Sequence, residues 1–241
     1  MMKYAIFAYD FPHTKSRDFI LALSVLDKDI DCILAAPKIK LNLPEPTLRI
    51  AVKQNEFFHP REIAALLGIP YFVVPHNSPE CIRIIKERNI DIGVIGGARI
   101  LAREVIEAFN YGVLNFHPGL IPDNRGLDNL KWAIYLNIPQ GVTTHFIDER
   151  VDAGRIILQE VIPVYEDDTL FDVNQRLYET QLKLIKPTLD LVEEKKDITY
   201  FARVEGGKVR SVMPAETEKE IPRLFERYKK EYSSICKRWK R

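Results

Sequence analysis

The residue pattern best suited to chemistry in this sequence is an asparagine and a histidine one residue apart, Asn115 and His117, at the end of a short apolar run. Alternate residues of a strand share a face, so the two side chains should point the same way. An amide N–H and a protonated imidazole can both donate hydrogen bonds to the negative oxygen that forms when an amine attacks a carbonyl group. The pair therefore predicts an acyl-transfer site in which the amine substrate is itself the nucleophile.

Carboxylates that could serve this pair follow about 35 positions later, as Asp148, Glu149 and Asp152 just before Gly154. The unperturbed pKa of histidine is about 6.5, so a nearby carboxylate favours the charged imidazole at neutral pH. The alternative is a structural histidine whose hydrogen bonds are satisfied in the core, and the residues alone leave both interpretations open.

The elements that must position these residues alternate between strands and helices. Short apolar runs predict strands at 4–8, 30–36, 71–74, 90–95 and 112–116, with a further short strand at 48–52. Helical spacing predicts helices at 14–26 capped by Thr14, at 60–67, at 79–88 and at 102–109. This order predicts an α/β fold, a Rossmann-like, mostly parallel twisted sheet flanked by helices. Ligands of such sheets bind at the carboxyl ends of the strands, where Asn115 and His117 lie.

The remaining chain divides into the end of this domain and a different tail. Strands are predicted at 142–147 and 155–164, and a helix from Thr169 to about Glu194 with a break at Pro187. From Glu218 to Arg241 there are nine basic and four acidic residues, with an apolar stripe at helical spacing. We therefore divide the chain into a catalytic domain, residues 1–195, and a short C-terminal extension with a basic helix, residues 196–241. The helix is predicted to pack on its stripe, with a lid or an anion-attracting patch as the alternative.

Bulk composition excludes several classes of protein. The 35 basic and 34 acidic residues give no indication of a nucleic-acid partner. Cys32, Cys81 and Cys236 are odd in number and far apart, which argues against a disulfide framework or a metal site. No run approaches 18 uninterrupted apolar residues, and the first apolar run meets Asp10 too soon for a signal peptide, so no membrane partner is expected. The cytoplasm is the default localisation.

Two runs carry a resemblance to a known family: LNFHPGLIPDNRG at 114–126 and GVTTHFIDERVDAGRIILQE at 141–160. They resemble the core of the folate-dependent formyltransferases, which act on glycinamide ribonucleotide, methionyl-tRNA or nucleotide sugars. The resemblance is specific over about residues 90–165 and only general before them. By position it implies catalytic roles for Asn115, His117 and Asp152, with 10-formyltetrahydrofolate as cosubstrate and no metal. One departure is Gly119, where the family usually has serine.

The resemblance also implies which residues hold the folate. The run at 98–101 resembles the segment whose backbone grips the pterin ring, and 147–151 resembles the loop that closes over it. The folate-binding residues expected on this basis are Arg99, Ile100, Leu101, Ile147, Asp148 and Val151. Core packing is the alternative for Ile100 and Leu101, and a solvated turn is the alternative for Asp148.

Three features of the sequence favour a nucleotide-sugar acceptor. Asn124-Arg125-Gly126 resembles the Arg-Gly of the sugar and methionyl-tRNA enzymes, which implies Arg125 and Gly126 as substrate-binding residues. Residues 199–203 resemble a tyrosine-rich segment of the same two groups. The turn at 9–13 has no glycine for a tight phosphate cradle, which argues against the purine enzyme.

Chain length then separates the sugar and tRNA enzymes. The stretch after Arg203 is too short for the five-stranded β-barrel of the tRNA enzyme. The expected substrate is therefore an amino sugar on a nucleoside diphosphate. Its diphosphate could meet Arg125, Lys131 or Arg203, with an ordinary surface or structural charge as the alternative for each. Trp132 is expected at the base or on an apolar helix face. Related sugar enzymes imply a homodimer. The alternatives are glycinamide ribonucleotide formyltransferase of purine synthesis and a catalytically silent folate-binding module.

Overall fold

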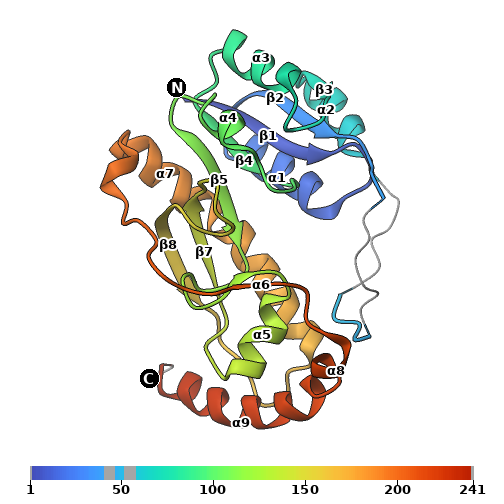
Figure 1. Cartoon of the computed structure of the whole chain (residues 1–241), viewed down its shortest axis with the longest axis vertical. Helices are drawn as coiled ribbons and strands as arrows, with labels where there is room; N and C mark the ends of the chain where they lie inside the picture. The colour runs from blue at the N-terminus through green and yellow to red at the C-terminus, as the bar shows by residue number, and fades with distance from the viewer. Residues whose placement is uncertain (1, 41–46, 52–57, 240–241) are drawn as a thin grey trace.

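The buried apolar runs predicted as strands assemble into one sheet in the computed structural model, which describes residues 2–40, 47–51 and 58–239, without the side chains of 234–239. The described residues form a seven-stranded sheet in the order β3-β2-β1-β4-β5-β7-β8. Its strands are β1 (Lys3–Tyr9), β2 (Asp29–Ala36), β3 (Tyr71–Val73), β4 (Ile92–Ile95), β5 (Gly112–His117), β7 (Gly141–Phe146) and β8 (Arg155–Val161). The first five strands in this order run parallel, β7 pairs antiparallel with β5, and β8 pairs antiparallel with β7. This mostly parallel sheet, flanked by helices, confirms the predicted fold class (Figure 1).

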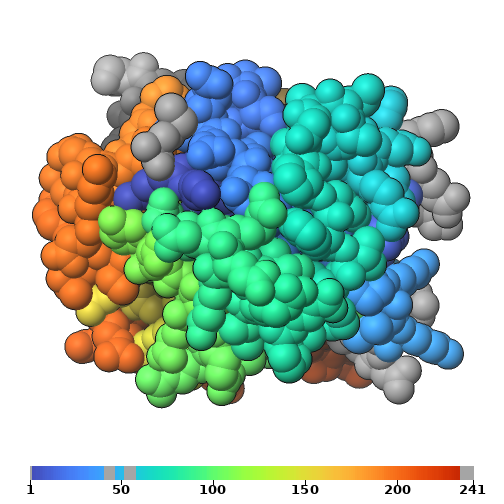
Figure 2. Space-filling view, turned by 90° about the horizontal axis from the view of Figure 1, so that it is seen from above, coloured from blue at the N-terminus to red at the C-terminus, as the bar shows by residue number. Residues whose placement is uncertain are grey.

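Alternate residues of β1 face two separate hydrophobic cores. Tyr4 and Ile6 belong to one core with residues of the helices on that face, whereas Ala5 and Phe7 belong to a second core on the other face. A strand buried on both faces loses the alternation of polar and apolar residues, which is why these strands read as continuous apolar runs. Figure 2 looks onto the end of the molecule that carries α3, where segments from cyan to green cover the sheet.

The helices begin and end largely where local chemistry predicts. They are α1 (Thr14–Val25), α2 (Pro60–Leu67), α3 (Pro79–Glu87), α4 (Arg103–Ile106), α5 (Asn129–Leu136), α6 (Leu170–Lys183), α7 (Ile185–Lys195), η1 (Ile198–Tyr200), α8 (Ala215–Glu218) and α9 (Ile221–Trp239). Gly68 ends α2 in the left-handed conformation, with φ of 67°. The predicted long helix at 169–194 breaks at Leu184 between α6 and α7. Pro187 explains the break, because it has no N–H to donate to the preceding turn.

Three local predictions were wrong. The cap of α1 is His13 rather than Thr14, because the His13 ring accepts the hydrogen bond from the Ser16 N–H. The helix predicted at 102–109 is only α4, since the chain then turns so that Asn110 N–H reaches Ile90 O. Residues 48–51 form no strand, and Val52 lies outside the described residues.

The C-terminal extension packs against the catalytic half through α9. Ile221, Phe225 and Tyr228 are buried, which confirms packing on one apolar stripe, and α9 lies beside α5 at the lower end of Figure 1. A two-stranded sheet that was not predicted joins β6 (Arg125–Gly126) to β9 (Val209–Arg210). Within the described part of the chain, no helix is both long and apolar enough to span a membrane.

Candidate active site

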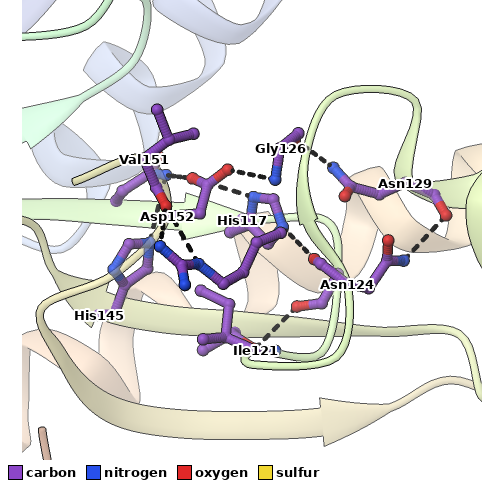
Figure 3. Close-up of polar contacts among 12 residues, drawn as sticks. His117, Ile121, Asn124, Gly126, Asn129, His145, Val151 and Asp152 are labelled. Carbon is purple, nitrogen blue, oxygen red and sulfur yellow. Dashed lines mark hydrogen bonds and ion pairs between the residues drawn. The ribbon is translucent and has the colours of Figure 1, made fainter. Parts of the chain in front are cut away.

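The carboxyl end of β5 brings Asn115 and His117 to a single carboxylate. His117 Nδ1 lies 3.2 Å from Asp152 Oδ1 (Figure 3). Asn115 Nδ2 donates to the same oxygen at 3.3 Å. Both side chains therefore point to one side of the strand, as their spacing predicts, and meet a residue that lies far away in the sequence.

Both ring nitrogens of His117 face oxygen acceptors. Besides Asp152 at Nδ1, the carbonyl oxygen of Asn124 lies 2.8 Å from Nε2 (Figure 3). A neutral imidazole has only one N–H, so only the doubly protonated ring can donate to both oxygens. The surroundings of this buried side chain therefore favour an imidazolium beside a carboxylate.

Asp152 is held as a carboxylate by the groups around it. Its second oxygen, Oδ2, accepts the Gly126 N–H at 2.8 Å. Burial raises the pKa of Asp152, but the hydrogen bond and charge of His117, together with the Gly126 N–H, outweigh it and hold the pKa below its usual value. Asp152 is therefore ionised at neutral pH and can keep His117 charged and oriented.

His145 is a fourth side chain of this cluster, and sequence reasoning did not select it as a site residue. Its Nδ1 lies 2.7 Å from Ala153 O, and its Nε2 lies 3.4 Å from Asn115 Nδ2. Burial, and then the charge of His117, lower the pKa of His145 to about 4. The neutral ring therefore donates from Nδ1 to the carbonyl and accepts from Asn115 at Nε2.

Asn115 consequently differs from its expected role as a donor with a free N–H. Its two amide hydrogens are shared between Asp152 at 3.3 Å and His145 at 3.4 Å. Both distances exceed the usual 2.7–3.2 Å of an N–H hydrogen bond, so a strong acceptor such as an oxyanion could compete for them.

Gly119, the departure from the family pattern, has a steric reason. A Cβ at this position would lie 2.5 Å from Asn124 O and 2.7 Å from His117 Nε2. A side chain here would therefore push into the hydrogen bond that orients the catalytic histidine. Thr143 Oγ1, on β7, donates to Gly119 O at 2.7 Å and so fixes the loop that follows β5.

A C-terminal segment, residues 204–213, crosses both loops of the site, and we call it the strap (Figure 1, orange to red). Val204 N–H donates to Gly154 O at 2.7 Å, two residues beyond Asp152. Leu127 N–H donates to Arg210 O at 2.9 Å, next to the β6–β9 pairing. The strap thus holds the loop before Leu127 and the loop that carries Asp152.

Arg125 and Gly126, which were predicted to bind substrate, also make contacts that hold the loops of the site together. The buried Arg125 guanidinium donates to Val151 O at 2.7 Å and to Gly206 O in the strap at 2.7 Å. The Gly126 N–H is engaged by Asp152, and a Cβ on Gly126 would lie 2.0 Å from Arg210 O. Both residues therefore tie the strap to the Asp152 loop.

Two other residues that were predicted to contact the acceptor substrate also make contacts inside the protein. Lys131 is buried and contacts Glu218 at 2.6 Å and Asp128 at 2.7 Å. Trp132 Nε1 donates to Ser211 O at 2.9 Å, which favours the helix-face interpretation of this residue. Arg203 remains open to solvent, and its guanidinium lies 3.9 Å from Asp148.

The six residues expected to hold folate lie in two places. In the first segment, Leu101 is buried, as its core-packing alternative predicts, whereas Ile100 is 68% exposed and Arg99 lies over the Tyr9 ring. Asn77 holds the backbone of this segment through Ile100 O and the Ala102 N–H.

The second segment borders a surface cavity of about 320 Å³. Ile147 and Asp148 line this cavity together with Arg203, whereas Val151 and the first segment are not part of its lining. The Asp148 carboxylate is engaged by Arg150 at 2.5 Å, which makes it part of an ordered turn. The cavity lining does not include Asn115, His117 or Asp152.

Comparisons with known proteins agree on one family. The family described as Formyl transferase matches residues 62–189. The methionyl-tRNA formyltransferase of Chlorobium limicola is 32% identical over 182 residues, 74% of this chain and 52% of that protein. The human trifunctional purine biosynthetic protein adenosine-3 is 36% identical over 111 residues, 45% of this chain and 11% of that protein. The chain thus spans about half the length of the first relative and about a tenth of the second.

Solved structures of formyltransferases resemble this chain in fold, at lower sequence identity. A sugar N-formyltransferase from Shewanella has a TM-score of 0.60 at 23% identity, with 88% of this chain and 77% of that chain covered. A phosphoribosylglycinamide formyltransferase from Bacillus halodurans has a TM-score of 0.61 at 24% identity, with 83% of this chain and 100% of that chain covered. At such identities the similarity concerns the fold.

Proposed function

Because this chain belongs to the formyl transferase family, we propose that it transfers a formyl group from 10-formyltetrahydrofolate to a primary amine. The observation that carries the proposal is the shared carboxylate oxygen, Asp152 Oδ1, which Asn115 and His117 approach at 3.3 and 3.2 Å. Such an arrangement supplies a charged donor and a neutral donor side by side, as a developing oxyanion requires.

Each member of the trio then has a distinct task. The amine nitrogen bonds to the formyl carbon, and the carbonyl electron pair moves to oxygen. The amine then loses a proton, the folate nitrogen takes one up, and the bond from the formyl carbon to the folate nitrogen breaks as the carbonyl re-forms. His117 and Asn115 donate hydrogen bonds to the oxygen while it is negative. Asp152 keeps His117 protonated and oriented, and lies close enough to assist the loss of the amine proton.

The proposed donor site is formed by the two predicted folate segments. The exposed Ile100, beside backbone groups that Asn77 holds, offers an apolar surface next to polar backbone, which suits a flat, partly polar ring. We propose that Arg99, Ile100, Leu101, Ile147, Asp148 and Val151 hold the folate. The folate would supply the activated formyl group, and these residues would orient it toward His117.

The proposed acceptor is an amino sugar on a nucleoside diphosphate. The turn at 9–13 without glycine and the segment at 199–203 support it, and the exposed Arg203 is the remaining cation of the three considered for the diphosphate. Glycinamide ribonucleotide is a second candidate, because the human purine biosynthetic protein is 36% identical to this chain over 111 residues. Cytoplasmic localisation and a homodimer belong to the same proposal.

The test is purified protein with 10-formyltetrahydrofolate and a panel of amino-sugar nucleotides and glycinamide ribonucleotide. We expect tetrahydrofolate and a formylated product only when an amine is present. Release of formate without any amine would indicate a hydrolase instead. Folate binding without turnover on any amine would indicate a silent folate-binding module and would refute the proposal.

A further inference from the structure

A lysine from the other half of the sheet reaches the backbone of the catalytic strand. Lys15, in the first turn of α1, donates from Nζ to Phe116 O at 3.1 Å. Phe116 stands between Asn115 and His117, so the ammonium group binds the carbonyl of the peptide bond that joins Phe116 to His117. Sequence analysis did not select Lys15, because nothing local connects it with residues about 100 positions away.

The end of β4 explains why this carbonyl is open to a side chain. Carbonyl groups alternate between the two edges of a strand, and that of Val113 faces β7, where it accepts the Ile147 N–H at 2.9 Å. The Phe116 carbonyl therefore faces the β4 side. The pairing of β4 with β5 reaches only Leu114, so Lys15 supplies the hydrogen bond that a longer β4 would have made.

The charged groups near the Phe116 carbonyl include more positive than negative charge. Asp152 contributes one negative charge, while the doubly protonated His117 and Lys15 contribute one positive charge each. The neighbouring histidines add none at neutral pH, because burial lowers the pKa of His13 and of His145 to about 4 in each case. The cluster of Asp152, His117 and Lys15 therefore carries a net charge of about +1 before an oxyanion forms.

We propose that Lys15 is a positioning residue for formyl transfer, whose ammonium group fixes the Phe116 carbonyl and leaves the site with the positive charge that the oxyanion neutralises. This inference rests on the proposed function. The titratable groups that face Lys15 are Asp152 across the site and the neutral His13 at the N-cap of α1. Burial lowers the pKa of Lys15 to about 8, and Asp152 opposes that change. The extra charge should therefore be present at neutral pH and disappear as the pH rises above about 8.

The kinetic test compares Lys15→Met, which removes the charge, with Lys15→Arg, which keeps it at every accessible pH. We expect Lys15→Met to lower kcat about tenfold or more with little change in KM for folate. Lys15→Arg should restore most of kcat and move the alkaline fall of activity to higher pH. The matched control is Lys28→Met, since Lys28 is also partly buried and is ion-paired with Glu193 at 2.9 Å, but lies at the amino ends of the parallel strands.

A titration of the Lys15 amino group by ¹⁵N NMR supplies a readout that needs no turnover. Replacing Asp152 with Asn should move the titration of Lys15 to lower pH, whereas Asp148→Asn should leave it in place. A parental kcat and pH profile in Lys15→Met, an alkaline limb unchanged in Lys15→Arg, or a titration unmoved by Asp152→Asn would each overturn the inference. Absence of turnover in the parent on every amine would instead refute the proposed function, and the titration would still decide whether Lys15 and Asp152 are coupled.

Discussion

Two adjacent glycines in the strap allow a sharp test of whether the C-terminal extension holds the catalytic loops. Gly206 and Gly207 both have positive φ, at 67° and 76°. A Cβ on Gly206 would meet nothing within 4 Å, whereas a Cβ on Gly207 would lie 2.1 Å from Pro122 O. Alanine at either position carries the same backbone strain, but only at Gly207 does it collide with the loop that precedes Asn124.

The magnitudes separate the two variants. Left-handed backbone costs an alanine about 1–2 kcal/mol relative to glycine, so Gly206→Ala should lower the free energy of unfolding by about that much. Gly207→Ala must also displace the strap, which endangers the hydrogen bonds of Val204 with Gly154 O and of Leu127 with Arg210 O. At about 0.5–1.5 kcal/mol for each bond, the total for Gly207→Ala is about 2–5 kcal/mol.

The assay measures thermal unfolding and kcat on the same preparations. In a chain of this size, 1 kcal/mol corresponds to about 2–4 °C in Tm, so Gly207→Ala should melt several degrees below Gly206→Ala. Its kcat should fall about tenfold or more, because the loop that carries Asn124 O and the Gly126 N–H loses its support. Equal Tm and equal kcat in the two variants would refute the idea that the strap positions the site.

The remaining predictions concern the catalytic cluster itself. His117→Ala should lower kcat about 100–1000-fold while folate affinity, measured by calorimetry, stays near that of the parent; unchanged turnover would contradict its role. The pKa of Asp152 is held below its ordinary value, so activity should be present above this lowered pKa and disappear as the pH falls through it. The Asp152→Asn variant should be weakly active, and its activity should lack this fall at acid pH. His145 has a folded pKa of about 4 against 6.5 unfolded, so its contribution to stability is complete above pH 6.5 and declines as the pH falls toward 4. His145→Gln should flatten the urea-unfolding free energy over that pH range, and a slope as steep as the parent's would count against the buried neutral ring.

The sequence was sufficient for the sheet and for the shared direction of Asn115 and His117, because both depend on short-range patterns, whereas the choice of Asp152 among three carboxylates came from the family resemblance. Strands buried on both faces leave continuous apolar runs, and two polar residues at i and i+2 on a strand end must share a face. His145 could not be found in this way. Its role follows from lying opposite Asn115 in the antiparallel pairing of β5 with β7, and no local pattern fixes that register.

The same limit explains why the sequence left the roles of charged residues near the site open. Arg125 and Lys131 could bind substrate or be ordinary surface or structural charges, since Gly206 and Glu218, which hold them, stand 81 and 87 positions away. The β6–β9 pairing is equally non-local, joining Arg125 to Val209. Burying an unpaired charge costs a large free energy, so a cation can be predicted as buried only when the group that pairs with it is known.

The buried Arg125 and Lys131 connect the C-terminal extension to the catalytic site. Removing Lys131 would leave the charge of the buried Glu218 uncompensated, at a typical cost of about 3–5 kcal/mol, whereas removing Glu218 would still leave Lys131 paired with Asp128. Arg125 in turn bonds both the strap and the backbone next to Asp152. The carboxylate that organises the site is therefore fixed by residues on both sides of position 195, and the charge cluster at β5 depends on the extension as directly as on the sheet that carries Asn115 and His117.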